Sequence, residues 1–317
     1  MATGTTADSL ITKAGITTLR VKTVDGPNTV YSQNYIVKVD NQNPTAGTLT
    51  MKLNSSTGST YTSGNWTNQN VWIHKNDGSD NLSGHQSTTY NVSGAETLNN
   101  QTADNTIQTE GTYTLTVKTL DKVSNSSTRG YTVKIDKTAP TDVAPIATAT
   151  TNSITATFKQ TDSLSGINNS SIQYAIKDGN SWSSWQTSKT FTGLKTNQTY
   201  IIKTKATDNA GNTRESKELS ITTTELKAGT LTLTKETATG SAYTSGQWSN
   251  KNVYVKLVQS STGTSTYSST SNSAQLVSAG TTVDTTVSTN GTTTLKVTTT
   301  DGNNTAYSQE YVIKVDK

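Results

Sequence analysis

Hydrophobic and polar residues alternate with a period of two in residues 19–23 and again in residues 35–39, on either side of the polar loop 25–28. This alternation is typical of two antiparallel strands that are each buried on one face. Aspartate, glycine and asparagine occur in the loop, and they tolerate the positive φ that a tight reversal requires. We therefore predict a β-hairpin over residues 15–40, and we expect the aspartate that starts its loop to accept hydrogen bonds from nearby backbone amides.

The same hairpin pattern recurs without gaps in residues 111–136 and 291–316, and with one inserted residue in residues 199–223. A second block repeats as well, because residues 229–255 match residues 47–73 and carry a tryptophan at the same position. One copy of each block gives a repeat of roughly 90 residues with about seven short strands, which is the size and strand density of an immunoglobulin-like sandwich. We predict an all-β chain of tandem β-sandwiches.

The composition fits thin cores between two sheets. Hydrophobic residues make up 30% of the 317 residues, and the mean hydropathy is −0.59. The net charge is +4, but lysine and arginine are dispersed along the predicted strands, as is usual for solvated faces and edges, so we expect no nucleic-acid binding. No run approaches the roughly 20 apolar residues of a membrane span. With 0 cysteines the usual sandwich disulfide is absent, which favours a bacterial or phage origin for an extracellular protein.

Residues 138–225 resemble a fibronectin type III domain over nearly their whole length. The resemblance rests on Pro140 at the entry, on residues 154–158 and 173–176 as the second and third strands, and on Leu194 six residues before Tyr200. The last pair is similar to the leucine and tyrosine of the family's tyrosine corner, in which the tyrosine hydroxyl bonds back to the backbone. Phenylalanine stands at position 158, where the family has a buried tryptophan, so the resemblance leaves the packing of this core open.

The flanking repeats resemble the immunoglobulin-like domains that bacterial surface proteins and adhesins carry in long tandem arrays. The phrases that support the resemblance are residues 111–115, residues 131–136 and the junction 137–141. The resemblance implies a stalk or adhesive module outside the cell, and similar modules decorate phage heads and tail fibres. Its motifs encode sandwich packing and no binding site.

These repeats predict four consecutive parts. They are the C-terminal half of an immunoglobulin-like repeat (1–43), an immunoglobulin-like domain (44–137), a fibronectin type III-like domain (138–225) and a second immunoglobulin-like domain (226–317). Short junctions with a proline four residues after Asp40 and after Asp136 favour a fairly stiff, elongated array.

Residues 2–40 align without gaps on residues 278–316 and therefore correspond to the second half of a repeat. Two interpretations follow: a piece of a longer array, which we favour, or a half-domain that strands of a neighbouring chain complete. The second would give self-assembly through the N-terminal half-domain.

Few residues suggest chemistry. His74 and His85 lie in a polar segment without the further ligands of a zinc site, so we predict surface positions for both. Aspartates recur at the predicted hairpin loops and in other loops (Asp25, Asp121, Asp162, Asp178, Asp208 and Asp301). Calcium between domains is one interpretation, but no single loop concentrates enough acidic residues, and turn capping is the simpler one. We predict no catalytic residue, no metal site and no cofactor.

Trp182 and Trp185 form the one candidate ligand-binding pair, because two neighbouring indoles can stack on a sugar. The alternative, which we favour, is that one indole is buried in the core while the other covers a sheet edge. Trp66 and Trp248 recur at matching positions of the repeated block, which predicts a shared packing role.

The sequence thus predicts a non-enzymatic, extracellular or cell-surface stalk, structural or adhesive, whose partners are neighbouring repeats and a surface glycan or protein receptor. The main alternative is a phage fibre or capsid decoration, located in the virion, that binds host-surface glycans. A carbohydrate-binding accessory of a larger enzyme is a weaker alternative.

Overall fold

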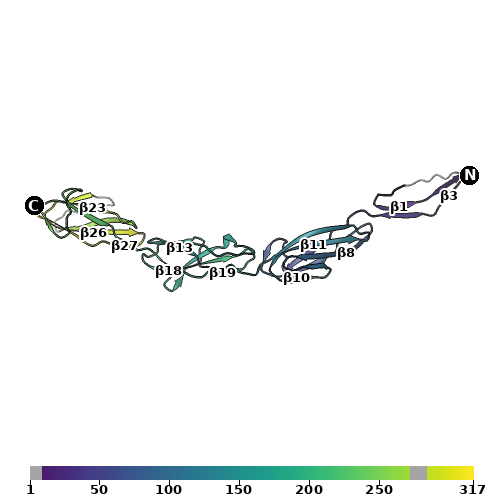
Figure 1. Cartoon of the computed structure of the whole chain (residues 1–317), viewed down its shortest axis with the longest axis horizontal. Helices are drawn as coiled ribbons and strands as arrows, with labels where there is room; N and C mark the ends of the chain where they lie inside the picture. The colour runs from purple at the N-terminus through teal and green to yellow at the C-terminus, as the bar shows by residue number, and fades with distance from the viewer. Residues whose placement is uncertain (1–8, 272–283) are drawn as a thin grey trace. The chain divides into compact units, whose positions relative to one another are not determined.

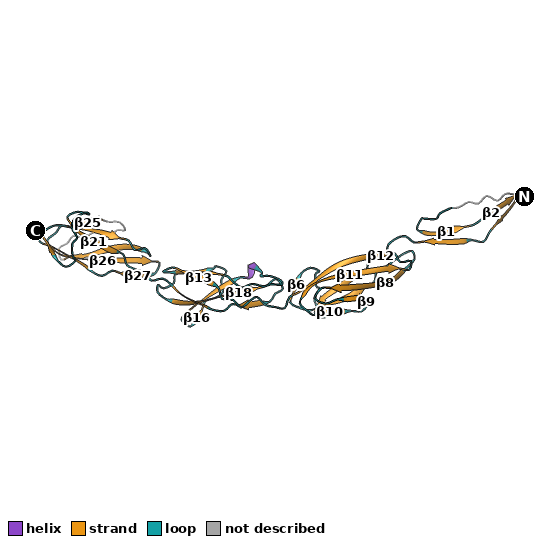
Figure 2. Cartoon of the chain, in the orientation of Figure 1, coloured by secondary structure: helices purple, strands orange, loops and turns teal. Residues whose placement is uncertain are grey.

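The computed structural model describes residues 9–271 and 284–317 (Figures 1 and 2). The chain divides into two compact units. The first comprises residues 1–139 with the short segments 162–167 and 208–212, and the second comprises the remaining residues. In the described residues nearly all regular structure is β, and the one helical element is the 3-10 turn η1 (Asn169–Ser171). The predicted all-β fold class is confirmed.

The N-terminal hairpin consists of four short strands. β1 (Gly15–Leu19) pairs with β4 (Tyr35–Val39), and β2 (Lys22–Asp25) pairs with β3 (Asn28–Tyr31), both antiparallel. The predicted hairpin over residues 15–40 is therefore confirmed, with an interruption between β1 and β2. Each of its sheets has two strands in the described part of the chain.

The first sandwich follows in the same unit. Its strands are β5 (Thr48–Leu53), β6 (Trp66–Thr67), β7 (Val71–Asn76), β8 (His85–Ser93), β9 (Leu98–Gln101), β10 (Asn105–Ile107), β11 (Gly111–Asp121) and β12 (Ser126–Ile135). One sheet has the order β10-β7-β5, and the other has the order β6-β12-β11-β8-β9. Alternate residues of β11 point into the core, where Tyr113, Leu115 and Val117 are fully buried. Burial therefore alternates along this strand with the same period of two residues as the hydrophobic positions in the sequence.

The second sandwich corresponds to the fibronectin-like segment. Its strands are β13 (Ile146–Ala149), β14 (Ser153–Thr157), β15 (Gln173–Asp178), β16 (Ser181–Trp182), β17 (Thr190–Thr192), β18 (Thr199–Thr207), β19 (Thr213–Glu215) and β20 (Leu219–Thr222). One sheet has the order β13-β14-β17; in the other, β15 and β18 are central, and β18 also pairs with β19 and β20.

Two features of the second sandwich confirm the sequence alignment. Tyr200 pairs with Ile221 across β18 and β20, as Tyr113 pairs with Val133 across β11 and β12. The alignment of residues 199–223 on the other hairpins, with one inserted residue, is therefore confirmed. The Lys195 backbone N–H donates to the Tyr200 hydroxyl at 2.9 Å, which is the predicted tyrosine corner. Phe158 lies just after β14, half-buried against the core.

The third sandwich repeats the first. Its strands are β21 (Thr230–Lys235), β22 (Trp248–Ser249), β23 (Val253–Val258), β24 (Thr264–Ser271), β25 (Asp284–Val287), β26 (Gly291–Asp301), β27 (Asn304–Tyr307) and β28 (Tyr311–Val315). One sheet has the order β21-β23-β25, and the other has the order β22-β28-β26-β24, with β27 also on β26. Leu295, Val297 and Ile313 of the repeated hairpin are fully buried between the sheets.

Candidate functional site at the junctions

The loop between the two strands of each repeated hairpin is held by the aspartate that starts it. Asp121 accepts hydrogen bonds from the backbone N–H groups of Val123 and Asn125 at 2.9 and 2.8 Å. Asp208 accepts from the backbone of residues 210–212 at 2.7–2.9 Å. Both carboxylates are almost fully buried, so these bonds replace the water that burial removes. The predicted turn capping is confirmed at these two loops.

An asparagine of the same loops bonds to the end of the preceding hairpin. The Asn125 side-chain amide donates to the Asp40 carbonyl at 3.3 Å, and the Asn212 amide donates to the Asp136 carbonyl at 2.9 Å. Asn212 also donates to the Thr138 carbonyl at 3.3 Å. Because each asparagine also donates to the capping aspartate of its own loop, one side chain couples the shape of the loop to the junction.

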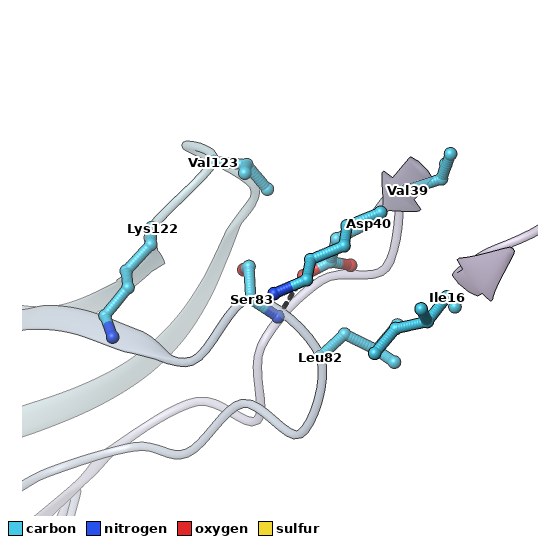
Figure 3. Close-up of a pocket in the computed structure, with 9 residues that line it drawn as sticks. Ile16, Val39, Asp40, Leu82, Ser83, Lys122 and Val123 are labelled. Atoms are coloured by element: carbon cyan, nitrogen blue, oxygen red, sulfur yellow. Dashed lines mark hydrogen bonds between the residues drawn. The ribbon is translucent and has the colours of Figure 1, made fainter. Parts of the chain in front are cut away.

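The side chains of Asp40 and Asp136 complete these two junctions. Asp40 Oδ2 accepts from the Ser83 backbone N–H at 2.9 Å, as Figure 3 shows, and Asp136 Oδ2 accepts from that of Ser165, also at 2.9 Å. Hydrogen bonding from Ser83, followed by the Gln42 backbone N–H, lowers the pKa of Asp40 below its ordinary value. The two junctions therefore use the same contacts at equivalent positions of the repeat.

The loop of the third sandwich makes a variant of this junction inside the second unit. The Asn304 side-chain amide donates to the Leu194 carbonyl at 2.9 Å, and its oxygen accepts from the Thr196 backbone N–H at 3.0 Å. Asp301 accepts from the Asn152 side-chain amide at 2.7 Å and from the Thr151 hydroxyl. The hairpin loop thus bonds to the preceding segment at all three junctions, but here the aspartate itself bonds to that segment, whereas Asp121 and Asp208 accept from their own loops.

At the first two junctions three carboxylates converge. The first group is Asp40, Asp80 and Asp121, and the second group is Asp136, Asp162 and Asp208. Within each group the carboxylate oxygens that could bind an ion lie within 4.8 Å of one another. Carboxylate oxygens are the donors that Ca²⁺ or Mg²⁺ takes, so these residues have the chemistry to hold such an ion. Each carboxylate also accepts hydrogen bonds from its own loop or junction, as turn capping requires. The clusters therefore do not by themselves identify a ligand.

Sequence reasoning missed these clusters because their members come from three loops that are far apart along the chain. A short repeated phrase could have revealed them: residues 80–84 read DNLSG and residues 162–166 read DSLSG. In both phrases the aspartate accepts from the backbone N–H of the glycine, at 2.7 Å for Asp80 and 2.6 Å for Asp162. Asp178, which the sequence grouped with Asp162 and Asp208, ends β15 and belongs to neither cluster.

A cavity of about 290 Å³ lies beside the first junction, between the end of the N-terminal hairpin and two loops of the first sandwich (Figure 3). Its apolar lining includes Ile16 and Val39 of the hairpin and Leu82 and Val123 of the sandwich. Apolar surface therefore continues from the hairpin across the junction.

The candidate pair Trp182 and Trp185 lies outside the core of the second sandwich, and both indoles are half-buried. The Lys203 ammonium lies 4.3 Å from the Trp182 ring centroid and 5.2 Å from that of Trp185. The Lys205 ammonium lies 4.5 Å from the Trp185 centroid. The expectation that one indole is buried in the core is wrong, because both contact lysines that alternate with the buried residues of β18.

The other singled-out aromatic side chains have separate surroundings. Trp66 and Trp248 have equivalent surroundings, since each lies in a short parallel edge strand with a lysine ammonium 5.7 or 5.8 Å from its ring. The expected packing role does not hold for Trp248, whose side chain is 60% exposed. His74 stacks on Trp72 and contacts Asp104 at 2.7 Å. His85 contacts the Thr88 hydroxyl at 2.9 Å, so each histidine has its own polar partner.

Residues 9–271 and 284–317 contain no helix that is long and apolar enough to cross a membrane. No family model matches the chain, and no curated protein matches it in sequence.

The solved structures that are similar to this chain include the following two. The FN1–FN3 domains of chicken CNTN1 are 11% identical with a TM-score of 0.29, and the match covers 87% of this chain and 99% of that one. Dimeric latent PorU from Porphyromonas gingivalis is 9% identical with a TM-score of 0.20, and the match covers 84% of this chain and 34% of that one. At these values neither likeness carries an argument about function. The sheets and cores described above are therefore the basis for assigning the fold. It consists of tandem β-sandwiches of the immunoglobulin and fibronectin type III kind.

Proposed function

We propose that this chain is a non-enzymatic structural array whose β-sandwich domains hold an adhesive or structural partner away from a surface outside the cell. The domains of the array are residues 44–137, 138–225 and 226–317, preceded by the half-domain 1–43. The observation that carries the proposal is the repeated junction, in which Asn125, Asn212 and Asn304 each bond to backbone carbonyls of the preceding segment.

The junctions support this function through their geometry and their length. Asn125 and Asn212 are each fixed by the capped loop from which they come, so bending at these two junctions would break bonds on both sides. The chain from Asp136 to Pro140 is too short to act as a free linker, and Thr138 within it donates to Glu110 of the first sandwich at 2.9 Å. A spacer needs such resistance to bending, whereas an enzyme would need a reactive constellation.

Distance measurements across the second junction test the proposal. The chain has 0 cysteines, so cysteines placed at the exposed residues Thr128 and Asn180 carry two unique spin labels. We expect one narrow distance distribution for the unmodified junction. A variant with a flexible Gly-Ser insert between Lys137 and Thr138 is the matched control, and it should broaden the distribution. Equal, broad distributions for both proteins would overturn the proposal.

The adhesive part of the proposal rests on Trp182 and Trp185. Two indoles with lysine ammonium groups against their rings form a patch that combines apolar and cationic groups, which suits an acidic glycan better than a neutral one. Binding of a sulfated or carboxylated polysaccharide that is lost in Trp182→Ala and Trp185→Ala would support this role. Trp248→Ala, at an exposed indole beside a single lysine, is the control.

A further inference from the structure

Two tryptophans and two lysines on the outer face of the second sandwich form one alternating series. Lys203 and Lys205 lie on the outward side of β18, between residues that point into the core. The Lys203 ammonium lies 4.3 Å from the Trp182 ring centroid and 5.2 Å from that of Trp185. The Lys205 ammonium lies 4.5 Å from the Trp185 centroid. Lys203 is therefore enclosed between two indoles, and Lys205 ends the series.

The two lysines also differ in how far their charge is already paired. Lys203 Nζ lies 2.6 Å from Glu215 Oε2, and the Lys203 side chain is only 18% exposed. Within residues 9–271 and 284–317, the Lys205 ammonium makes neither an ion pair nor a hydrogen bond. An ammonium has three N–H donors, and contact with one ring leaves donors available for an anion. Lys205 can therefore bind an acidic group directly, whereas at Lys203 the group must first displace Glu215.

A third lysine lies on the same face. Lys177 is the partner of Trp182 in the pairing of β15 with β16. Because Ile176 packs against the core, the alternation of the strand places Lys177 on the outward side and Asp178 on the side of Ile176. Three ammonium groups thus share this face with the Glu215 carboxylate, and the face has an excess of positive charge.

The other sandwiches lack this combination. Tyr113 of β11 is equivalent to Tyr200 of β18, so Lys205 corresponds to Lys118 of the first sandwich. The strands beside β11 there are β8 and β9, and neither contains a tryptophan. In the third sandwich β24, which pairs with β26, contains none either. A device that only stabilised the repeated sheet would be expected in every copy, so its restriction to one domain favours a binding surface.

We propose that Lys205 binds the acidic group of a polysaccharide ligand on this face, with Lys177 as a second cationic contact, and that Glu215 limits the affinity by occupying Lys203. The inference rests on the adhesive part of the proposed function and assigns the residues that set its affinity. Glu215 belongs to β19 of the same domain, so its carboxylate has a far higher effective concentration at Lys203 than a dissolved ligand has. The excess positive charge attracts an acidic polymer and does not attract a neutral one.

Binding of three polysaccharides to the full chain tests the inference. They are sulfated dextran, polygalacturonate and uncharged dextran, and the affinities are measured by isothermal titration calorimetry at low salt. Binding of either acidic polymer without binding of uncharged dextran supports the ligand class. Lys205→Met keeps the apolar stem of the side chain and should weaken binding about tenfold through the loss of one charge-assisted contact. Glu215→Gln releases Lys203 and should strengthen binding about threefold.

Lys118→Met is the matched control. It lies at the equivalent position of the first sandwich, without tryptophans beside it, and its replacement changes the net charge by the same amount as Lys205→Met. We expect the affinity of Lys118→Met to equal that of the unmodified chain. Thermal melting of the three variants shows that each of them is folded.

The outcomes separate this inference from the proposed function. If the unmodified chain binds neither acidic polymer, the adhesive role is wrong and this inference is wrong with it. If the chain binds but Lys205→Met binds as tightly as Lys118→Met, or Glu215→Gln binds no more tightly than the unmodified chain, this inference alone is overturned. Single-stranded DNA that bound as tightly as the polysaccharides, with the same loss in Lys205→Met, would overturn the assignment to a glycan.

Discussion

The side-chain amide of Asn212 donates to the backbone carbonyl of Asp136 at 2.9 Å, although 76 residues separate them in the sequence. Asn125 makes the equivalent bond to Asp40, 85 residues away. In both cases the donor belongs to a hairpin loop and the acceptor is the last residue of the preceding hairpin copy (residues 15–40 or 111–136). The contact is therefore a property of the repeat.

Replacing Asn212 with alanine should loosen the second junction. The change removes the donors to Asp136 and Thr138 and leaves the buried Asp208 with one bond fewer, at a cost of about 1–3 kcal/mol for the groups left unpaired. We expect faster trypsin cleavage after Lys137 and a broader distance distribution between the spin labels. Asn180→Ala, at an exposed turn, is the matched control for the cleavage measurement and should leave the rate unchanged. Unchanged cleavage and an unchanged distribution would contradict this role for Asn212.

Tyr200→Phe should destabilise the second sandwich by about 1–3 kcal/mol, because the Lys195 backbone N–H would lose the hydroxyl of the buried Tyr200 as its acceptor. Chemical denaturation followed through the fluorescence of Trp182 and Trp185, with the other three tryptophans (Trp66, Trp72 and Trp248) replaced by phenylalanine in all proteins compared, measures the change in this sandwich. Tyr307→Phe is the control, since that side chain is 63% exposed and its replacement should change stability by less than about 0.5 kcal/mol. Equal effects of the two substitutions would remove the tyrosine-corner assignment.

The equivalent leucines of the two hairpin copies should respond differently to truncation. Leu295→Ala opens a cavity in a closed core and should cost about 2–5 kcal/mol in the third sandwich. Leu19→Ala removes a half-exposed side chain and should change stability by less than about 0.5 kcal/mol. Differential scanning calorimetry of both variants makes the comparison. A large effect of Leu19→Ala in dilute protein would show that something already covers the hairpin.

Asp162→Asn should stabilise the second junction in the presence of a chelator. Asparagine keeps an oxygen that can accept from Gly166, while one of three charges that lie within 4.8 Å of one another is removed. Relief of this repulsion contributes on the order of 1 kcal/mol. Thermal melts with EDTA measure it, with Asp178→Asn at an exposed strand end as control. A loss of stability that occurs only when a divalent cation is added would contradict the interpretation of these carboxylates as turn caps.

The elements that follow from local pattern were predicted correctly. Alternation in residues 19–23 and 35–39 predicted the hairpin, and the spacing of Leu194 and Tyr200 predicted the tyrosine corner. The missed features depend on contacts between distant loops. Asp80, Asp121 and Asp40 come together only because the end of the N-terminal hairpin meets two loops of the first sandwich, and the duplicated DNLSG and DSLSG phrases are the local sign of this contact. The surroundings of Trp182 and Trp185 were predicted wrongly because pattern does not say which sheet face a loop covers.

Small-angle X-ray scattering of the full chain tests the central claim, a serial array with resistant junctions. A compact protein of 317 residues would have a radius of gyration of about 20 Å. A single sandwich is as long as its longest strand, and the 11 residues of β11 span roughly 36 Å, so sandwiches in series should give a radius of gyration of roughly 35 Å or more. We predict the larger radius of gyration, and we expect the radius of gyration to change when a flexible Gly-Ser segment is inserted after Lys137. A value near 20 Å would contradict the account.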